Sequence, residues 1–484
     1  MAPRFAMHAR VVFGVVCGLF TVALGACSGG GDEAPPAPPP PTFHADVEPL
    51  MQRRCQSCHH AAGEGDDTAA GLGPFSLVGY ESARRYASSV VAQTSARSMP
   101  PFGARKTDEC APRLPYMDDV TLTDAEISML RRWLDAGAPE GDASQAPAPI
   151  SLRSTTGLSR ITQTLAPPKP YEVKASGKDE FRCFVLDPGF EEDAWISGVD
   201  VVPQNSVVTH HVVVYVDEKR ESLDRVGGKV GDSYPCFGGP DLEDTNLLAA
   251  WAPGARAMDY GDKAAVKVKK GSLIVSQVHY HPRSDASESD QTSLQLNRLA
   301  GQPEWQAIVA LIGNADSAKG LVKLLPGADD PGEPAFSIPA GARGHVEEMT
   351  FTFTPDILPT FVDLRLSSVG THMHWVGRDM KISLERAEPE PEADRPATEC
   401  LVQTPAWDFN WQRGYRYDAP FEELPVIRTG DTLRMRCTYD NTMDNPFVRR
   451  ALSDLHLTSP QDVKLGETTL DEMCLGAFIF LLKP

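Results

Sequence analysis

Short runs of β-branched and aromatic residues, separated by Pro and Gly, fill the chain from about residue 145 to its end. Runs of this length and composition are typical of strands, and frequent turn signals between them favour antiparallel β-sandwiches. The clearest runs are ISGVDVVP, VVTHHVVVYV, SLIVSQVHYH, EEMTFTFT, FVDLRLSSVG, MKISLE, DTLRMRCTYD and LGAFIFLL. Because the region is longer than one ordinary domain, we expect two sandwiches.

The N-terminus has the pattern of an export signal. Basic residues precede the apolar run Val11 to Ala23, which is short for a membrane span and typical of a signal-peptide core. The following LGACSGGG resembles the lipobox of bacterial lipoproteins, which implies lipidation of Cys27; an ordinary signal peptide is the alternative. We therefore expect a lipoprotein signal peptide at 1–27 and a Pro-rich linker at 28–42. The protein would be exported and membrane-anchored, at a periplasmic or outer-membrane face.

The net charge of the chain bears on its binding partners, and its cysteine content on the cellular compartment in which it folds. The chain has 46 Lys and Arg against 66 Asp and Glu, a formal charge of −20, which argues against a nucleic-acid partner. Export allows disulfides to form. Six of the ten cysteines lie outside the signal, the lipobox and the motif described next: Cys110, Cys183, Cys236, Cys400, Cys437 and Cys474. An even number permits complete pairing.

A c-type haem attachment pattern stands in RCQSCHH, where Cys55, Cys58 and His59 have the required spacing. Two thiols bond to the haem and the adjacent His binds the iron. A redox C-x-x-C would need a βαβ context and a zinc site a second ligand pair, and the flanking sequence offers neither. Met99, before two prolines in RSMPPFG, is the natural second axial ligand, with a core methionine as the alternative.

Helices are expected around this motif. Thr123 and Glu126 match a T-x-x-E capping box in front of an apolar stripe at helical spacing. The flanks resemble the monohaem cytochromes c, whose axial Met often precedes Pro. We therefore expect a small all-α cytochrome c domain over residues 43–141, followed by a linker at 142–170. Such a domain would transfer single electrons.

Histidines recur in pairs in the strand-rich region. His210 and His211 are adjacent in VVTHHVVVYV, although neighbouring side chains of a regular strand point to opposite faces. His372 and His374 would share one face of a strand, roughly 6 to 7 Å apart along the backbone, which lets both reach one ion. A polar face that merely shows two histidines is the alternative.

The third ligand of any such site stays open at this point. The candidates are several methionines and His279 or His281 in SQVHYHP. Two imidazoles with one thioether would favour copper, especially Cu(I), because soft sulfur selects it, whereas three imidazoles suit copper or zinc.

Six motifs in order resemble the copper type II, ascorbate-dependent monooxygenases, the family of dopamine β-monooxygenase and the peptidylglycine hydroxylating monooxygenase. The motifs are THHVVVYV, WAPG, QVHYH, THMHWVGR, RCTYDNT and LDEMC. The resemblance runs from about Glu180 to the C-terminus. It implies two copper ions in two antiparallel, jelly-roll-like β-sandwich domains, which we expect at 171–298 and 299–484.

The resemblance also assigns individual residues. It implies two ligand sets: His210, His211 and His279 for an electron-transfer copper, and His372, His374 and Met473 for the catalytic copper at which O₂ reacts. It implies the disulfides Cys183–Cys236 and Cys437–Cys474, and leaves Cys110 and Cys400 without an assigned pairing. If both His210 and His211 bind one ion, the strand must bulge or end there.

The chain departs from the family at substrate-binding positions. Gly370 and Ala477 stand where the peptide-hydroxylating branch has an Arg and a Tyr that hold a substrate carboxylate, so a peptide carboxylate is not expected. Met373 replaces the usual Thr between the two histidines. His281 is additional, and a competing ligand, a proton carrier and a solvent-exposed residue are its three interpretations.

The combined expectation is a copper-dependent monooxygenase that hydroxylates a C–H bond of a small organic substrate with O₂. The reaction needs two electrons from outside the substrate, and the haem would supply them from an upstream one-electron donor. A non-catalytic copper-binding or electron-transfer lipoprotein would use the same ligands and is the alternative.

Overall fold

The computed structural model describes most of the chain after the N-terminal segment. The described residues are 39–61, 73–150, 157–176, 178–243, 245–252, 255–283, 285–315, 320–327, 330, 332–390, 395–468 and 470–483. The predicted signal peptide with Cys27, and most of the linker predicted at 28–42, lie outside them. None of the described helices combines the length and the apolar character needed to cross a bilayer.

Four of the six described α-helices precede the strand-rich region and pack around a small apolar cluster that includes Phe43, Leu50 and Trp133. The α-helices are α1 (Glu48–Arg54), α2 (Tyr80–Arg85), α3 (Ala87–Ser95), α4 (Asp124–Asp135), α5 (Ser222–Arg225) and α6 (Pro446–Asp454). The predicted capping box begins α4, because Thr123 accepts from the Glu126 N–H and the Glu126 carboxylate accepts from the Thr123 N–H. This reciprocal pair satisfies two N–H groups that the helix itself leaves open.

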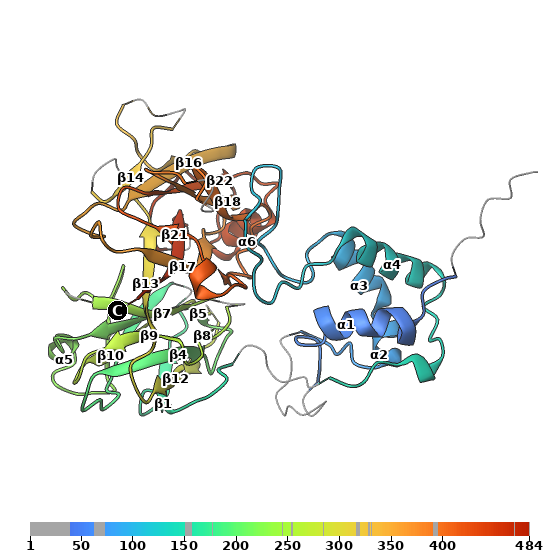
Figure 1. The fold of residues 1–484 in the computed structure, drawn as a ribbon, viewed down its shortest axis with the longest axis horizontal. Helices are drawn as coiled ribbons and strands as arrows, with labels where there is room; N and C mark the ends of the chain where they lie inside the picture. The colour runs from blue at the N-terminus through green and yellow to red at the C-terminus, as the bar shows by residue number, and fades with distance from the viewer. Residues whose placement is uncertain are drawn as a thin grey trace, which may run out of the picture. The chain divides into compact units, whose positions relative to one another are not determined.

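Strands from both parts of the strand-rich region belong to one fifteen-stranded sheet (Figure 1, green to red). Its main path is β1 (Gln163–Leu165), β12 (Ser293–Leu299), β4 (Ala194–Val202), β9 (Ala264–Val268), β13 (Trp305–Gly313), β7 (Thr245–Trp251), β5 (Thr209–Asp217), β10 (Leu273–Tyr280), β3 (Glu180–Leu186) and β6 (Ser233–Pro235). The branches are β8 (Met258–Asp259), β17 (Leu364–His372), β20 (Gly414–Arg416), β21 (Val426–Ile427) and β24 (Leu475–Leu482).

A smaller five-stranded sheet faces the C-terminal branch. Its order is β14 (Val322–Leu324), β16 (Arg343–Thr352), β22 (Thr432–Asp440), β18 (Gly377–Glu385) and β19 (Thr398–Thr404). The remaining pairs are β2 (Tyr171–Val173) with β11 (Glu288–Asp290) and β15 (Ser337–Ile338) with β23 (Val463–Lys464). Phe353, just after β16, meets Phe480 of β24 edge-on with ring centroids 5.8 Å apart.

The strand β13 joins the two parts of the strand-rich region. It pairs with β9 and β7 on the N-terminal side and, from Gln306 to Gly313, with β24, which in turn pairs with β17. Side chains such as Val214 of β5 and Met435 of β22 belong to one continuous apolar core. The two expected sandwiches are therefore joined through shared strands and a shared core.

The predicted fold class is wrong in its N-terminal part. Residues 41–484 form one compact, predominantly β unit, and the described residues contain no separate small all-α domain. The segment between α3 and α4 leaves the helices: Phe102 is buried in the β core, and Cys110 is disulfide-bonded to Cys400 of β19. Four short helices bury little apolar surface, so this segment gains more by packing against the larger β core. Where one domain ends and the next begins along the chain stays a prediction.

Candidate functional site

Adjacent histidines reach the same side of a sheet because β5 bulges at His210. In the pairing of β5 with β10, His211 lies opposite His279, but the next residue of β10, Tyr280, lies opposite Thr209. His210 is thus the extra residue of a bulge, which turns its side chain out of the regular alternation. The distortion predicted for two neighbouring histidines that serve one site is confirmed.

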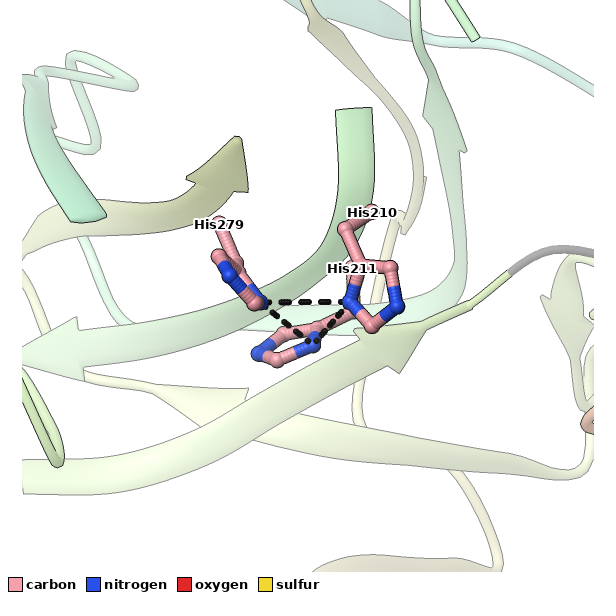
Figure 2. Close-up of side chains that lie close together, drawn as sticks. All are labelled: His210, His211 and His279. Atoms are coloured by element: carbon pink, nitrogen blue, oxygen red, sulfur yellow. Dashed lines mark hydrogen bonds between the residues drawn. The ribbon is translucent and has the colours of Figure 1, made fainter. Parts of the chain in front are cut away.

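The bulge gathers three imidazoles, His210, His211 and His279, which we call the triad centre (Figure 2). Their Nδ1 atoms lie 3.2 Å apart between His210 and His211, 3.1 Å between His210 and His279, and 3.4 Å between His211 and His279. A neutral imidazole has one donor and one acceptor nitrogen, so the three converging nitrogens cannot all satisfy one another by hydrogen bonds, whereas a cation between them would accept a lone pair from each.

The spacing of the triad centre suits a metal ion. A point equidistant from three nitrogens at these separations lies about 1.9 Å from each, close to the usual metal–imidazole distance. Burial lowers the pKa of all three imidazoles, and the positive charges of neighbouring histidines lower those of His210 and His211 further. The rings are therefore neutral near pH 7, the form in which imidazole binds metals. The triad could bind one ion.

An aspartate stands behind the triad centre. The Oδ1 atom of Asp179 lies 3.3 Å from Nε2 of His279, the nitrogen that faces away from the other two rings. A carboxylate in this position fixes the tautomer of a ligating histidine and raises its basicity. The same oxygen lies 2.9 Å from Nδ1 of His281, whose side chain is 42% exposed and lies outside the triad.

A second set of candidate ligands, His372, His374 and Met473, lies where β17 ends and β24 begins; we call it the mixed centre. His372 is the last residue of β17 and pairs with Leu475, the first residue of β24. The rings of His372 and His374 lie 5.3 Å apart, nearly perpendicular. Met473, two residues before Leu475, is buried and lines the same cavity as His372.

Hydrogen bonds fix how the two histidines of the mixed centre present their nitrogens. Nδ1 of His372 donates to Oε1 of Gln412 over 2.5 Å, and Nδ1 of His374 donates to the carbonyl oxygen of Asp471 over 3.0 Å. In both rings Nε2 then carries the lone pair for an ion. Burial lowers the pKa of His372, and burial together with the charge of His372 lowers that of His374 to about 3, so both are neutral near pH 7.

Three interactions fix the loop segments of the mixed centre. The fully buried Glu472 carboxylate accepts the backbone N–H groups of His374, Val376 and Met473. Burial raises the pKa of Glu472 to about 8, while these N–H donors act in the opposite direction. The hydroxyl of Tyr439 donates to the carbonyl oxygen of Met473 over 2.9 Å. The Cys437–Cys474 disulfide ties the neighbouring residue to β22.

Both centres border one cavity of about 270 Å³, lined by His211 from the triad centre and by His372 and Met473 from the mixed centre. Phe409 lies between the centres, with its ring 4.9 Å from that of His210 and 6.2 Å from that of His374. Gly370 and Ala477 are direct partners across β17 and β24 and line the cavity. At these two positions, where the peptide-hydroxylating branch has a carboxylate-binding Arg and Tyr, the cavity wall has small, uncharged residues.

A larger cavity of about 480 Å³ surrounds the C-x-x-C-H motif, with Cys55, Cys58, His59 and Met99 in its wall. The two thiols are not bonded to each other, whereas the other six described cysteines form three disulfides: Cys110–Cys400, Cys183–Cys236 and Cys437–Cys474. Burial raises the pKa of Cys55 to about 12, unlike the lowered pKa of a redox-active C-x-x-C thiol. Nδ1 of His59 donates to the carbonyl oxygen of Phe75 over 3.0 Å, which leaves Nε2 for a metal.

Comparison with known proteins agrees with the motifs. Dopamine beta-hydroxylase from Rattus norvegicus is 24% identical over 310 residues, which cover 59% of this chain. The matched part spans 43% of that relative, less than half its length. This distant similarity supports the resemblance to the copper monooxygenases. No protein-family model matches the chain.

Similar solved structures include viral coat proteins at low scores. The major capsid protein P2 of bacteriophage PM2 covers 66% of this chain and 97% of its own, with 8% identity and a TM-score of 0.22. The cowpea mosaic virus top component covers 69% and 94%, with 8% identity and a TM-score of 0.27. TM-scores this low do not indicate a shared fold.

Four residues that contact the candidate ligands were not predicted from the sequence: Asp179, Phe409, Gln412 and Glu472. Glu472 lies inside the LDEMC motif, so its position next to the candidate ligand Met473 could have indicated a role in the site. The other three carry no local signal, because each meets its histidine through tertiary packing. Gln412 and its partner His372, for example, are 40 residues apart.

Proposed function

We propose that this chain is a copper-dependent monooxygenase that hydroxylates a C–H bond of a small organic substrate with O₂. One oxygen atom enters the product and the other leaves as water, so each turnover consumes two external electrons and two protons. The observation that carries the proposal is the meeting of two different ligand sets, three imidazoles and two imidazoles with a thioether, at one cavity.

The donor sets fit copper. Three neutral imidazoles suit copper or zinc, while a thioether ligand favours copper, especially Cu(I). When bound, one copper ion at each centre would supply one of the two electrons. His210, His211 and His279 would hold the first ion, and His372, His374 and Met473 the second, with the cavity leaving room for substrate beside the mixed centre.

A covalently bound haem c would be the source of these electrons. Cys55 and Cys58 would attach it, with His59 and Met99 as axial ligands. The cavity around the motif, the unpaired thiols and the free Nε2 of His59 support this proposal. An upstream one-electron donor would reduce the haem, in the role that ascorbate has for the family.

The lipobox resemblance adds a location. Lipidation of Cys27 would anchor the exported protein to a membrane, at a periplasmic or outer-membrane face, and the Pro-rich linker would hold the folded part away from the surface. Intact mass of the membrane-extracted protein tests this directly: a diacylated or triacylated N-terminal Cys27 is expected, and an unmodified N-terminus contradicts it.

Product analysis tests the enzyme proposal. The full-length protein, loaded with haem and copper, is incubated with ¹⁸O₂, reductant and an extract of host metabolites, and mass spectrometry searches for products that gain one ¹⁸O. We expect such a product with the wild type and none with His372→Ala. A copper-binding or electron-transfer lipoprotein, the alternative, would bind copper at both centres and form no labelled product.

A further inference from the structure

Three consecutive residues lie between the two cavities. Trp411 and Arg413 line the cavity that contains Cys55, Cys58 and His59, while Gln412 and Arg413 line the cavity of the mixed centre. Arg413 is thus part of both walls. The segment is short and leads into β20, which pairs with β17, the strand that ends at His372.

Contacts continue from this segment to the mixed centre. Oε1 of Gln412 accepts a hydrogen bond from Nδ1 of His372 over 2.5 Å, and Nε2 of Gln412 donates to the carbonyl oxygen of Phe409 over 2.9 Å. The Gln412 side chain is buried and held at both ends. The Gln412 side chain therefore connects the backbone of the segment, between Trp411 and Arg413, to the imidazole of His372.

The opposite end of the segment reaches the loop that carries Met99. The guanidinium of Arg413 lies 4.9 Å from the centre of the ring of Phe102, which is fully buried and only three residues after Met99. The ring of Tyr415 stands edge-on to Phe102 at 5.1 Å, and the Cys110–Cys400 disulfide ties the same loop to β19. These contacts belong to the β core, so the spacing between Met99 and Arg413 is held by tertiary packing.

Arg413 also has a buried donor to offer a ligand. Its Nε–H is buried and has no hydrogen-bond partner among the described residues. Leaving such a donor unpaired costs free energy, which an acceptor in the cavity would recover. The two carboxylates of a haem are acceptors of this kind.

We propose that Phe102, Arg413 and Gln412 form the electron path from the Met99 side of the haem to His372. The inference rests on the proposed function. It adds the copper site at which electrons from the haem enter: the first electron reaches the mixed centre directly. In this step Fe(II) haem becomes Fe(III) and Cu(II) at the mixed centre becomes Cu(I), with no bond made or broken. Electron transfer through protein favours a continuous chain of bonded and contacting atoms, which these residues supply.

The triad centre has different neighbours. The ring of His279 stacks on Phe181 at 4.1 Å and that of His210 on Phe409 at 4.9 Å. Neither phenylalanine belongs to the wall of the cavity with Cys55 and Cys58. Gln412 bonds directly to His372 but reaches His210 only through the Phe409 carbonyl and ring, so the mixed centre is the nearer point of entry and the triad centre acts as the second electron store.

Anaerobic flash reduction tests the path without substrate or turnover. The full-length protein is loaded with haem and saturating Cu(II), the haem is reduced photochemically, and its absorbance reports reoxidation by copper. We expect a fast phase in the wild type and slowing by about an order of magnitude or more in Arg413→Ala and in Gln412→Leu. The haem potential and the copper occupancy of each variant are measured alongside, so that rates are compared at known driving force and full copper loading. Arg434→Ala, whose side chain pairs with Glu348 and Glu385, is the matched control and keeps the wild-type rate.

Two ligand variants locate the point of entry. His211→Ala should keep the fast phase, and His372→Ala should lose it although the triad centre still holds copper. The reverse pattern would show entry at the triad centre and overturn the path. Unchanged rates in both Arg413→Ala and Gln412→Leu would also overturn it, with the proposed function intact. A wild-type haem that copper never reoxidises would instead contradict the proposed haem function itself.

Discussion

The triad centre and the mixed centre show two ways of building a metal site on strands. The triad centre lies within a sheet, where a bulge at His210 and the register of β5 against β10 bring three imidazoles together. The mixed centre lies at strand ends, where Glu472, Tyr439 and a disulfide hold His374 and Met473 in place. Backbone pairing positions the first set, and side-chain interactions with loops position the second. We therefore expect the second set to be the more sensitive to changes outside its own ligands.

The largest expected effect is loss of turnover on removal of either ligand set. His372→Ala and His211→Ala should each reduce hydroxylation by at least about a thousandfold, or about 4 kcal/mol in transition-state free energy. His372→Ala should keep the copper ion of the triad centre, and His211→Ala that of the mixed centre. Copper analysis with electron paramagnetic resonance should show one remaining ion, with three nitrogen ligands in His372→Ala. Full copper content in either variant would contradict the assigned ligands.

The next effect compares two disulfides. Replacing both Cys437 and Cys474 by Ser, or both Cys183 and Cys236, opens loops of 37 or 53 residues. Chain entropy then predicts a loss of about 4 kcal/mol in the free energy of unfolding for each pair. Denaturant titration measures this loss. Only the first pair adjoins a ligand, so only that variant should lose copper from the mixed centre. Equal copper loss in both variants would contradict a specific role of the Cys437–Cys474 disulfide in holding Met473.

Asp179→Asn should weaken the triad centre alone. Loss of the carboxylate behind His279 is expected to reduce copper affinity there by about 10- to 100-fold, because the imidazole loses the partner that fixes its orientation. Competition with a copper chelator measures the affinity of each centre. A similar loss at the mixed centre would mean that the two sites are coupled through the shared cavity.

The smallest effect is expected for His281→Ala. His281 shares Asp179 with His279 but lies outside the triad and is 42% exposed. Copper affinity at the triad centre should therefore change by no more than about threefold, within the usual range of surface substitutions. The same chelator titration as for Asp179→Asn provides the matched measurement. A loss as large as that of Asp179→Asn would make His281 a ligand.

Local patterns predicted several elements well. The run around His210 is β5, the capping box at Thr123 begins α4, and the bulge follows from two adjacent histidines that serve one site. The fold of the N-terminal part was predicted wrongly, because local patterns show where helices form and not which core a connecting loop joins. Phe102 reads as a loop residue in the sequence, yet it is buried in the β core.

Local sequence was enough to identify the chemical types of the candidate ligands: a C-x-x-C-H motif, paired histidines in strands, a methionine beside a cysteine, and their order along the chain. Which distant residues meet depends on the three-dimensional packing of the chain. Cys110 bonds to Cys400 across 290 residues, Asp179 stands behind His279, and Arg413 lies between two cavities. Short-range patterns reflect backbone preference and burial, whereas such pairings depend on how whole strands pack and in which register they lie.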